Sequence, residues 1–151
     1  MADTTTALSA HGTIWAIQKT PGGAFTDVAQ LGDIMPPEMS RKEFDSSVHG
    51  KNIDQYVLGI LRRGAMTVPL NFIPDDGSMD HLAGLQKLMI DNTITGHRVR
   101  FPTSTGGTLD WIMSGQVQAM KPKAPVDGKL EIDVTLRFSG FMSIGGVLIG
   151  T

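Results

Sequence analysis

The sequence predicts a mainly β protein: a β-sandwich or barrel of two packed sheets, with one flanking α-helix at about residues 80–91 and a long polar loop at about residues 35–52. Three observations lead to this fold class. Several short segments alternate apolar and polar residues, which is the period of a strand with one buried face. One segment has the period of a helix instead, and one has neither period. At 151 residues the chain is long enough for one core, so we expect a single domain over residues 1–151.

Residues 129–138 have the clearest strand pattern in the chain. The apolar residues that alternate there are Leu130, Ile132, Val134, Leu136 and Phe138. Residues 108–119 alternate less regularly around Gly115, where a glycine favours a bulge. The connecting segment KPKAPVDG contains two prolines and the tight-turn pair Asp127-Gly128. Together these segments predict an antiparallel hairpin in the core.

The earlier strands are less regular. Residues 66–72 alternate but contain Pro69, which predicts an edge strand or a bulge. Residues 97–101 alternate three large residues with two arginines, and residues 12–19 are rich in strand formers. Residues 25–34 predict a bent strand, because their apolar residues recur every third position around a glycine.

Two segments have helical periodicity. The first gives the helix at about residues 80–91, with Ser78 as a candidate N-cap; its apolar stripe is Leu82, Leu85, Leu88 and Met89. A weaker helical stripe covers residues 53–63 and stops at Gly64; it consists of Ile53, Tyr56, Val57, Ile60 and Leu61. Gly59 in the middle of this second stripe argues against a stable helix.

The segment between residues 35 and 52 fits no period and is polar, charged and opened by two prolines. Long structureless loops inside compact domains are uncommon and usually either functional or disordered. One interpretation is a surface loop without a role. The other is an arm that orders against another molecule through the following residues: Met39, Phe44 and Val48 as apolar anchors and Arg41, Lys42, Glu43 and Asp45 as a polar rim.

The residues that usually carry catalysis or bind metals are scattered. The chain has no cysteine, and no two of its four histidines are spaced for a shared metal. The segment PDDGSMDH gathers Asp75, Asp76, Asp80 and His81, but it lacks the alternating ligands of a calcium loop and predicts a turn before a helix. The glycine-rich PTSTGGT has no lysine and predicts a hairpin turn rather than a phosphate loop. We therefore expect no catalytic site, no metal and no cofactor.

Charge and hydropathy limit the partners. The formal net charge is -2 and the pI is near 6.0, which does not favour DNA binding through excess Lys and Arg. Arg98 and Arg100 on one strand could contact phosphate, although a solvated face or pairing between subunits is the simpler interpretation. The N-terminus has no secretory signal pattern, and no apolar segment is long enough to span a bilayer. We expect a soluble protein that does not insert into membranes.

Three segments, taken in order, resemble a known family. SGQVQAMKPKAPVDGKLEIDVTLRFSG is similar to the C-terminal hairpin of the major tail tube proteins of long-tailed bacteriophages of the siphovirus, lambda-like type. FTDVAQLGDIMPPEMSRKEFDSS resembles the strand and loop that enter that family's stacking arm. YVLGILRRGAMTVPLNFIPDD resembles its following segments, although Arg62-Arg63 stands where that family more often has an acidic or small residue.

The resemblance implies a structural virion protein rather than an enzyme. Such subunits form homo-hexameric rings that stack into a tube through which DNA passes during ejection. It implies tape-measure, tail-tip and tail-terminator proteins as partners, assembly in the host cytoplasm and a final location in the virion tail. Glu131 and Asp133, on the polar face of the best strand, are then candidates to face the lumen. The alternatives are a type VI secretion-like or gene-transfer-agent tube subunit, or a small β-barrel ligand-binding module or enzyme, which would need a convergent polar pocket.

Overall fold

The computed structural model of the chain describes residues 8–9, 12–50 and 52–149. Its main body is one antiparallel sheet in the order β2-β1-β6-β7-β8-β5, with β9 paired to β8. The strands of this sheet are β1 (Ile14–Gln18), β2 (Phe25–Asp27), β5 (Met66–Asn71), β6 (Thr95–Pro102), β7 (Thr108–Lys123), β8 (Glu131–Ile144) and β9 (Val147–Ile149). A second sheet contains β3 (Met39–Asp45) and β4 (Tyr56–Arg63), and the helix α1 (Leu85–Asp91) packs against β7. The predicted class, mainly β with one helix, is confirmed.

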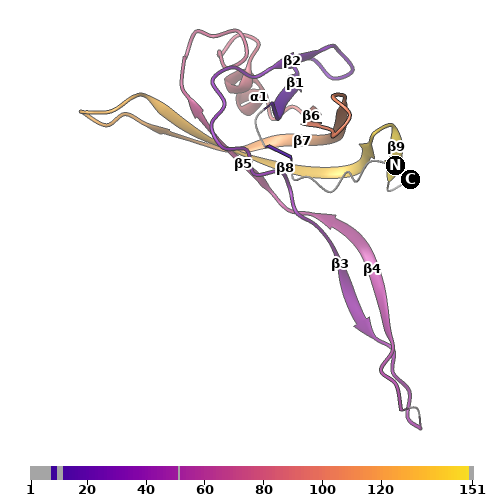
Figure 1. Cartoon of the computed structure of the whole chain (residues 1–151). Helices are drawn as coiled ribbons and strands as arrows, with labels where there is room; N and C mark the ends of the chain where they lie inside the picture. Colours follow the sequence, from indigo (N-terminus) through magenta and orange to yellow (C-terminus); the bar gives the residue numbers. More distant parts are fainter. Residues whose placement is uncertain (1–7, 10–11, 51, 150–151) are drawn as a thin grey trace.

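The main sheet curls so that β1 and β2 lie over β7 and β8 (Figure 1). The core fills the space between these layers and is built from one face of almost every strand of the main sheet, together with the inner side of α1. Its largest fully buried side chains include Trp15, Ile17, Met66, Leu70, Met79, Leu85, Met113 and Leu136. Every long strand of the body therefore uses its apolar face for a single core, as period-two patterns require.

The predicted central hairpin is confirmed as β7 and β8. Four of its five predicted apolar residues are buried, namely Ile132, Val134, Leu136 and Phe138. The irregularity expected at Gly115 is a register shift between Met113 and Gly115. A Cβ on Gly115 would lie 2.5 Å from Cδ1 of Phe138, so this bulge needs glycine for the Phe138 ring to reach the core.

Pro69 lies in β5, the edge strand of the sheet, as the sequence predicts. The outer side of β5 is partly covered by the segment after β2, which forms isolated bridges from Leu31 to Leu70 and from Met35 to Thr67. The Gly32 N–H donates to the Pro69 carbonyl at 2.8 Å. The bent segment predicted at residues 25–34 therefore shields an edge that would otherwise present unpaired backbone groups.

The helix is shorter than predicted and begins later. It spans Leu85–Asp91 instead of residues 80–91, and Gly84 is its N-cap, without a side-chain hydrogen bond. The expectation that Ser78 caps it is wrong: the Ser78 hydroxyl is buried and donates to Oδ1 of Asp76 at 2.6 Å. Turns stabilised by aspartate side chains replace the first predicted helical turn, because Asp and Ser side chains compete with helical backbone bonds.

His97 is fully buried between two aromatic side chains. Its ring stacks on Trp15 with centroids 6.0 Å apart and meets the ring of Phe138 edge-on at 5.8 Å. Nε1 of Trp15 donates to Nδ1 of His97 at 3.4 Å, and because an indole nitrogen can only donate, Nδ1 carries a lone pair. Nε2 therefore holds the proton of the neutral ring. Burial lowers the pKa of His97 to about 4, an effect only partly offset by the backbone of Gly115.

The folded protein is expected to lose stability as the pH falls from about 6.5 to 4. The folded-state pKa of His97 lies below its ordinary value of 6.5, so the unfolded chain takes up the proton first. A shift of this size corresponds to about 2 kcal/mol of unfolding free energy lost by pH 5. His97→Phe keeps an aromatic ring in the stack and should flatten this pH dependence in urea unfolding. His81→Phe, at an exposed position, should not change it. An unaltered pH dependence in His97→Phe would contradict this assignment.

Candidate functional site

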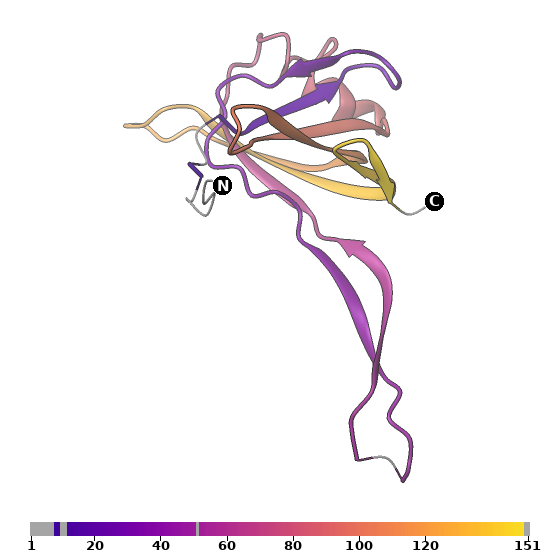
Figure 2. The ribbon, with the colours of Figure 1, turned by 45° about the vertical axis from the view of Figure 1, so that its right-hand side comes forward.

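A two-stranded arm projects from the body and is the most prominent feature outside the core (Figures 1 and 2). It consists of β3, β4 and the tip that joins them, and it leaves the body below β5 and β8. Two corrections follow. The predicted polar loop at residues 35–52 contains a seven-residue strand, Met39–Asp45, and the weak helix predicted at residues 53–63 is the strand Tyr56–Arg63. The two strands pair antiparallel from Met39 opposite Arg63 to Asp45 opposite Tyr56.

Both corrections have the same physical cause. An isolated ribbon has no core face, so β3 needs no apolar alternation and all of its residues except Met39 are exposed. In β4, apolar residues occupy both faces, which gives an apolar run that periodicity cannot assign to helix or strand. The informative signals are Gly59 and the Tyr56-Val57 pair, which disfavour a helix and favour a strand.

β4 carries a stripe of three large exposed apolar side chains, Tyr56, Leu58 and Ile60, which are 54%, 62% and 76% exposed, respectively. Tyr56 and Leu58 share one face of the arm with their acidic partners across the ladder, Asp45 and Glu43. A bulge gives β4 one extra residue after Leu58, so Ile60 lies on the opposite face. The helical stripe predicted from the sequence includes Tyr56 and Ile60 but not Leu58. Large apolar side chains exposed together on one strand are typical of a surface that is covered by a partner.

The opposite face of the arm is partly covered by its own side chains. The ring of Phe44 crosses Gly59, where a Cβ would lie 2.8 Å from Cε2 of the ring. Nζ of Lys42 lies 5.2 Å from the centre of this ring, and Nη1 of Arg41 donates to the Gly59 carbonyl at 3.0 Å. These contacts hold the two strands together across the bulge that follows Arg41.

The remaining predicted arm residues have different surroundings. Met39, at the root, packs against the core of its own chain. Val48 is exposed near the tip. The role of both residues as anchors for a partner stays a prediction. Oδ1 of Asp45 accepts the Ser47 N–H at 2.8 Å, and this bond lowers the pKa of Asp45. At the root, Arg63 donates to the Gly140 carbonyl of β8 and fixes the arm to the body.

Glu131 and Asp133, the candidate lumen residues, lie side by side on the polar face of β8. Nζ of Lys129 is 3.6 Å from Glu131, and Nζ of Lys123 is 3.1 Å from Asp133. The ladder also places Lys121 opposite Asp133. Neighbouring lysines therefore offset the negative charge of both carboxylates. The sequence alone did not show this pairing. Their position relative to a channel stays a prediction.

The arginines of β6 are paired within the chain. Nε of Arg100 contacts Oδ1 of Asp110 at 2.8 Å in a two-point contact, which lowers the pKa of Asp110, and Arg98 lies 3.4 Å from Asp27. Both arginines of β6 are therefore engaged by aspartates of their own chain, and the side chains of Arg98 and Arg100 are only 16% and 33% exposed, respectively.

The predicted turn at PDDGSMDH is confirmed. Oδ1 of Asp80 accepts the N–H groups of Ala83 and Gly84, and the Ala83 bond is the main cause of a lowered pKa at Asp80. The Asp76 carboxylate binds Ser78. Within the described residues, no three His, Asp or Glu side chains are grouped to hold a metal ion. No helix in the described ranges is long and apolar enough to cross a membrane.

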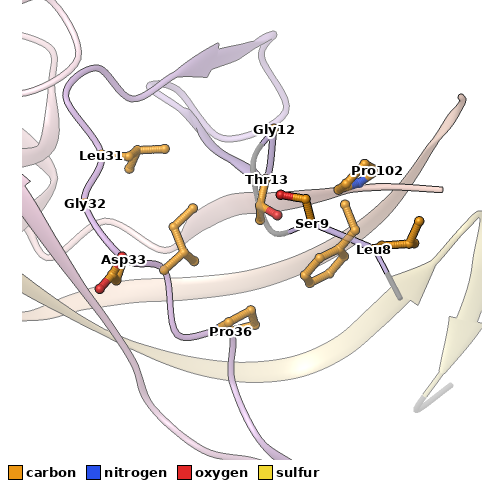
Figure 3. Close-up of a pocket in the computed structure, with 11 residues that line it drawn as sticks. Leu8, Ser9, Gly12, Thr13, Leu31, Gly32, Asp33, Pro36 and Pro102 are labelled. Carbon is orange, nitrogen blue, oxygen red and sulfur yellow. The ribbon is translucent and has the colours of Figure 1, made fainter. Parts of the chain in front are cut away.

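A groove of about 650 Å³ lies at the end of the body where the N-terminal segment passes the β6–β7 turn (Figure 3). Leu31, Ile34, Pro36 and Phe101 give it an apolar lining, to which Asp33 adds one carboxylate. Among the described residues that line it, Asp33 is the one with an ionisable side chain.

The chain is similar to known proteins in structure but not in sequence. No protein-family model matches the chain, and no curated protein matches it in sequence. A chain in the six-fold symmetrised baseplate of the anti-feeding prophage has a TM-score of 0.70 at 11% identity, with 95% of this chain and 98% of that chain covered. A chain in the C6-symmetric tail of an empty gene transfer agent particle has a TM-score of 0.67 at 14% identity, covering 96% and 99%.

The SPP1 tail tube gives a TM-score of 0.69 at 11% identity, covering 89% of this chain and 77% of that chain. Identities this low establish the fold alone. The described chain therefore has the fold of proteins found in phage tail tubes, gene-transfer-agent tails and contractile injection systems.

Proposed function

We propose that this protein is a tail tube subunit of a long-tailed bacteriophage, which assembles into stacked hexameric rings through which DNA passes. The observation that carries the proposal is the arm. An isolated two-stranded ribbon is marginally stable in water, and this one exposes Tyr56, Leu58 and Ile60 on a single strand. A projecting apolar ribbon is stabilised when it is buried against another molecule, and the fold is shared with proteins from assembled tubes.

Six-fold rings are supported by the symmetry of two of the similar structures, the gene-transfer-agent tail and the anti-feeding prophage baseplate. Tape-measure, tail-tip and tail-terminator proteins would complete the assembly at its ends. The proposed role is structural and not catalytic. The proposed location is the virion tail, after assembly in the host cytoplasm.

The direct test is electron microscopy of purified protein after concentration. We expect rings about one subunit thick and stacked tubes with a central channel. A protein that remains monomeric and folded at every concentration, with and without a tail-tip preparation to nucleate growth, would contradict the proposal.

The lumen assignment has its own test. Replacing Glu131 and Asp133 by lysine removes two carboxylates that offset Lys123 and Lys129, so the face becomes strongly basic. If this face lines the channel, variant tubes should retain DNA at low salt and release it as salt rises, because each neutralised phosphate releases counterions. Arg98→Lys, which keeps the charge unchanged, is the matched control. Variant tubes that retain no more DNA than unmodified tubes would place these carboxylates outside the channel.

A further inference from the structure

The β7–β8 hairpin forms a second projection, on the side of the body away from β9 (Figure 1). The pairing of β6 with β7 ends at Gly115, so only β8 flanks the rest of β7. Val126 stands in the turn and is 99% exposed. Turns favour Gly, Pro, Asn, Asp and Ser for reasons of backbone geometry, and an apolar β-branched side chain adds nothing to such a turn.

The turn that presents Val126 is stiff. Two prolines, Pro122 and Pro125, restrict its backbone, and the Gly128 N–H reaches the Pro125 carbonyl at 3.4 Å. A Cβ on Gly128 would lie 2.7 Å from Cγ of Pro125, so the two residues are in close contact. A rigid apolar knob loses little conformational entropy when it binds, which is the property of a preorganised contact.

A matching recess lies at the other end of the body. It measures about 540 Å³ and is almost entirely apolar; its main lining residues are Pro36, Pro37, Phe101, Pro102, Leu109 and Trp111. Two of these residues contact each other, since the rings of Phe101 and Trp111 meet edge-on with centroids 5.2 Å apart. It adjoins the groove of Figure 3, with which it shares Pro36 and Phe101.

The knob and the recess of one chain cannot meet. β7 begins at Thr108 beside the recess and ends at Lys123 beside the knob, and its 16 residues span about 50 Å at about 3.3 Å per residue. A contact between them therefore requires two copies of the chain. Such a contact joins different surfaces of the two copies, and contacts of this kind close into rings when the rotation permits.

We propose that the Val126 knob of one subunit inserts into the apolar recess of a second copy and anchors the lateral contact within a ring. The charges beside the knob do not oppose this contact. Lys123 and Lys129 pair with Asp133 and Glu131 of their own chain, so the contact is made by apolar side chains on both sides. This inference deepens the proposed function, because it names a surface that joins subunits. It is separate from the arm, which leaves the body in another direction (Figure 2).

The absence of native cysteine permits a direct crosslinking test. Val126→Cys and Ser104→Cys, at the knob and the recess rim, are purified separately, mixed and oxidised. We expect a disulfide-linked dimer containing one chain of each kind, formed at least about tenfold faster than with Leu82→Cys in place of Val126→Cys, since a specific contact raises the effective concentration. Equal rates with the two partners would overturn the inference.

A second measurement separates this inference from the proposed function. Val126→Asp should weaken ring formation at least about tenfold, as the loss of one buried valine does, while Ala124→Asp two residues away should not. Ring formation is followed by sedimentation velocity, with thermal unfolding to show that both variants stay folded. If Val126→Asp assembles like the unmodified protein, the knob contact is wrong and the proposed tube function still stands. If even the unmodified protein never assembles, the proposed function fails, and the crosslinking result alone decides the contact.

Discussion

Ile132→Asp is expected to abolish soluble folding. Ile132 lies on the apolar face of β8, is buried in the core and pairs with Leu70 of β5 and Pro122 of β7. A carboxylate there would be removed from water, and none of the buried polar side chains of the described core, Ser78, Thr95 and His97, carries a positive charge at neutral pH to pair with it. The cost is several kcal/mol, which is comparable with the total stability of about 5–15 kcal/mol of a domain.

The matched control places the same new side chain on the other face of the same strand. Arg137 is exposed, five residues further along β8, and Arg137→Asp should change the unfolding free energy by no more than about 0.5 kcal/mol. Ile132→Val, which removes one methylene, should remain soluble and lose about 0.5–1.5 kcal/mol in urea unfolding. Ile132→Asp with unchanged thermal stability would mean that the register of β8 is shifted by one residue.

The parts of the fold that were predicted correctly are those where one core determines the pattern. In β7 and β8 every second residue faces the core, so the alternation around Ile132 and Val134 contains the register itself. Pro69 in β5 belongs to the same group, because its missing N–H favours an edge strand or a bulge, and β5 is the edge strand. In these elements, the burial of one strand face in the core determines both the sequence pattern and the tertiary structure.

The two arm strands, which were predicted wrongly, have no core face. β3 is polar on both sides and β4 apolar on both sides, so neither shows the alternation of a half-buried strand. We infer that the apolar and polar pattern of β3 and β4 depends on the partner that covers the arm in an assembly. That partner is not part of the single chain. The candidate site was therefore predicted only in part: the arm was located, but the Tyr56, Leu58 and Ile60 stripe lies on the strand opposite the residues that were proposed as anchors.

Replacing the arm stripe with threonine is expected to abolish tube assembly without unfolding the subunit. Tyr56→Thr, Leu58→Thr and Ile60→Thr keep β propensity, and all three side chains already face solvent in the single chain. Burying a large apolar side chain contributes about 1.5–3 kcal/mol, and about 1.4 kcal/mol changes an association constant tenfold. Losing three in every subunit contact should therefore lower the affinity by several orders of magnitude, which electron microscopy and sedimentation of concentrated protein would show as free subunits.

The control for this variant removes the same number of exposed apolar residues elsewhere. Leu82→Thr, Ile94→Thr and Val147→Thr lie on the body, at exposures similar to those of the stripe. Both triple variants should unfold at nearly the same temperature as the unmodified protein, because neither changes a core residue. If the stripe variant still builds full-length tubes, the arm does not bind its partner through these three side chains. Phe44 and Val57 would then be the residues that contact the partner, since they are the remaining large exposed apolar side chains of the paired strands.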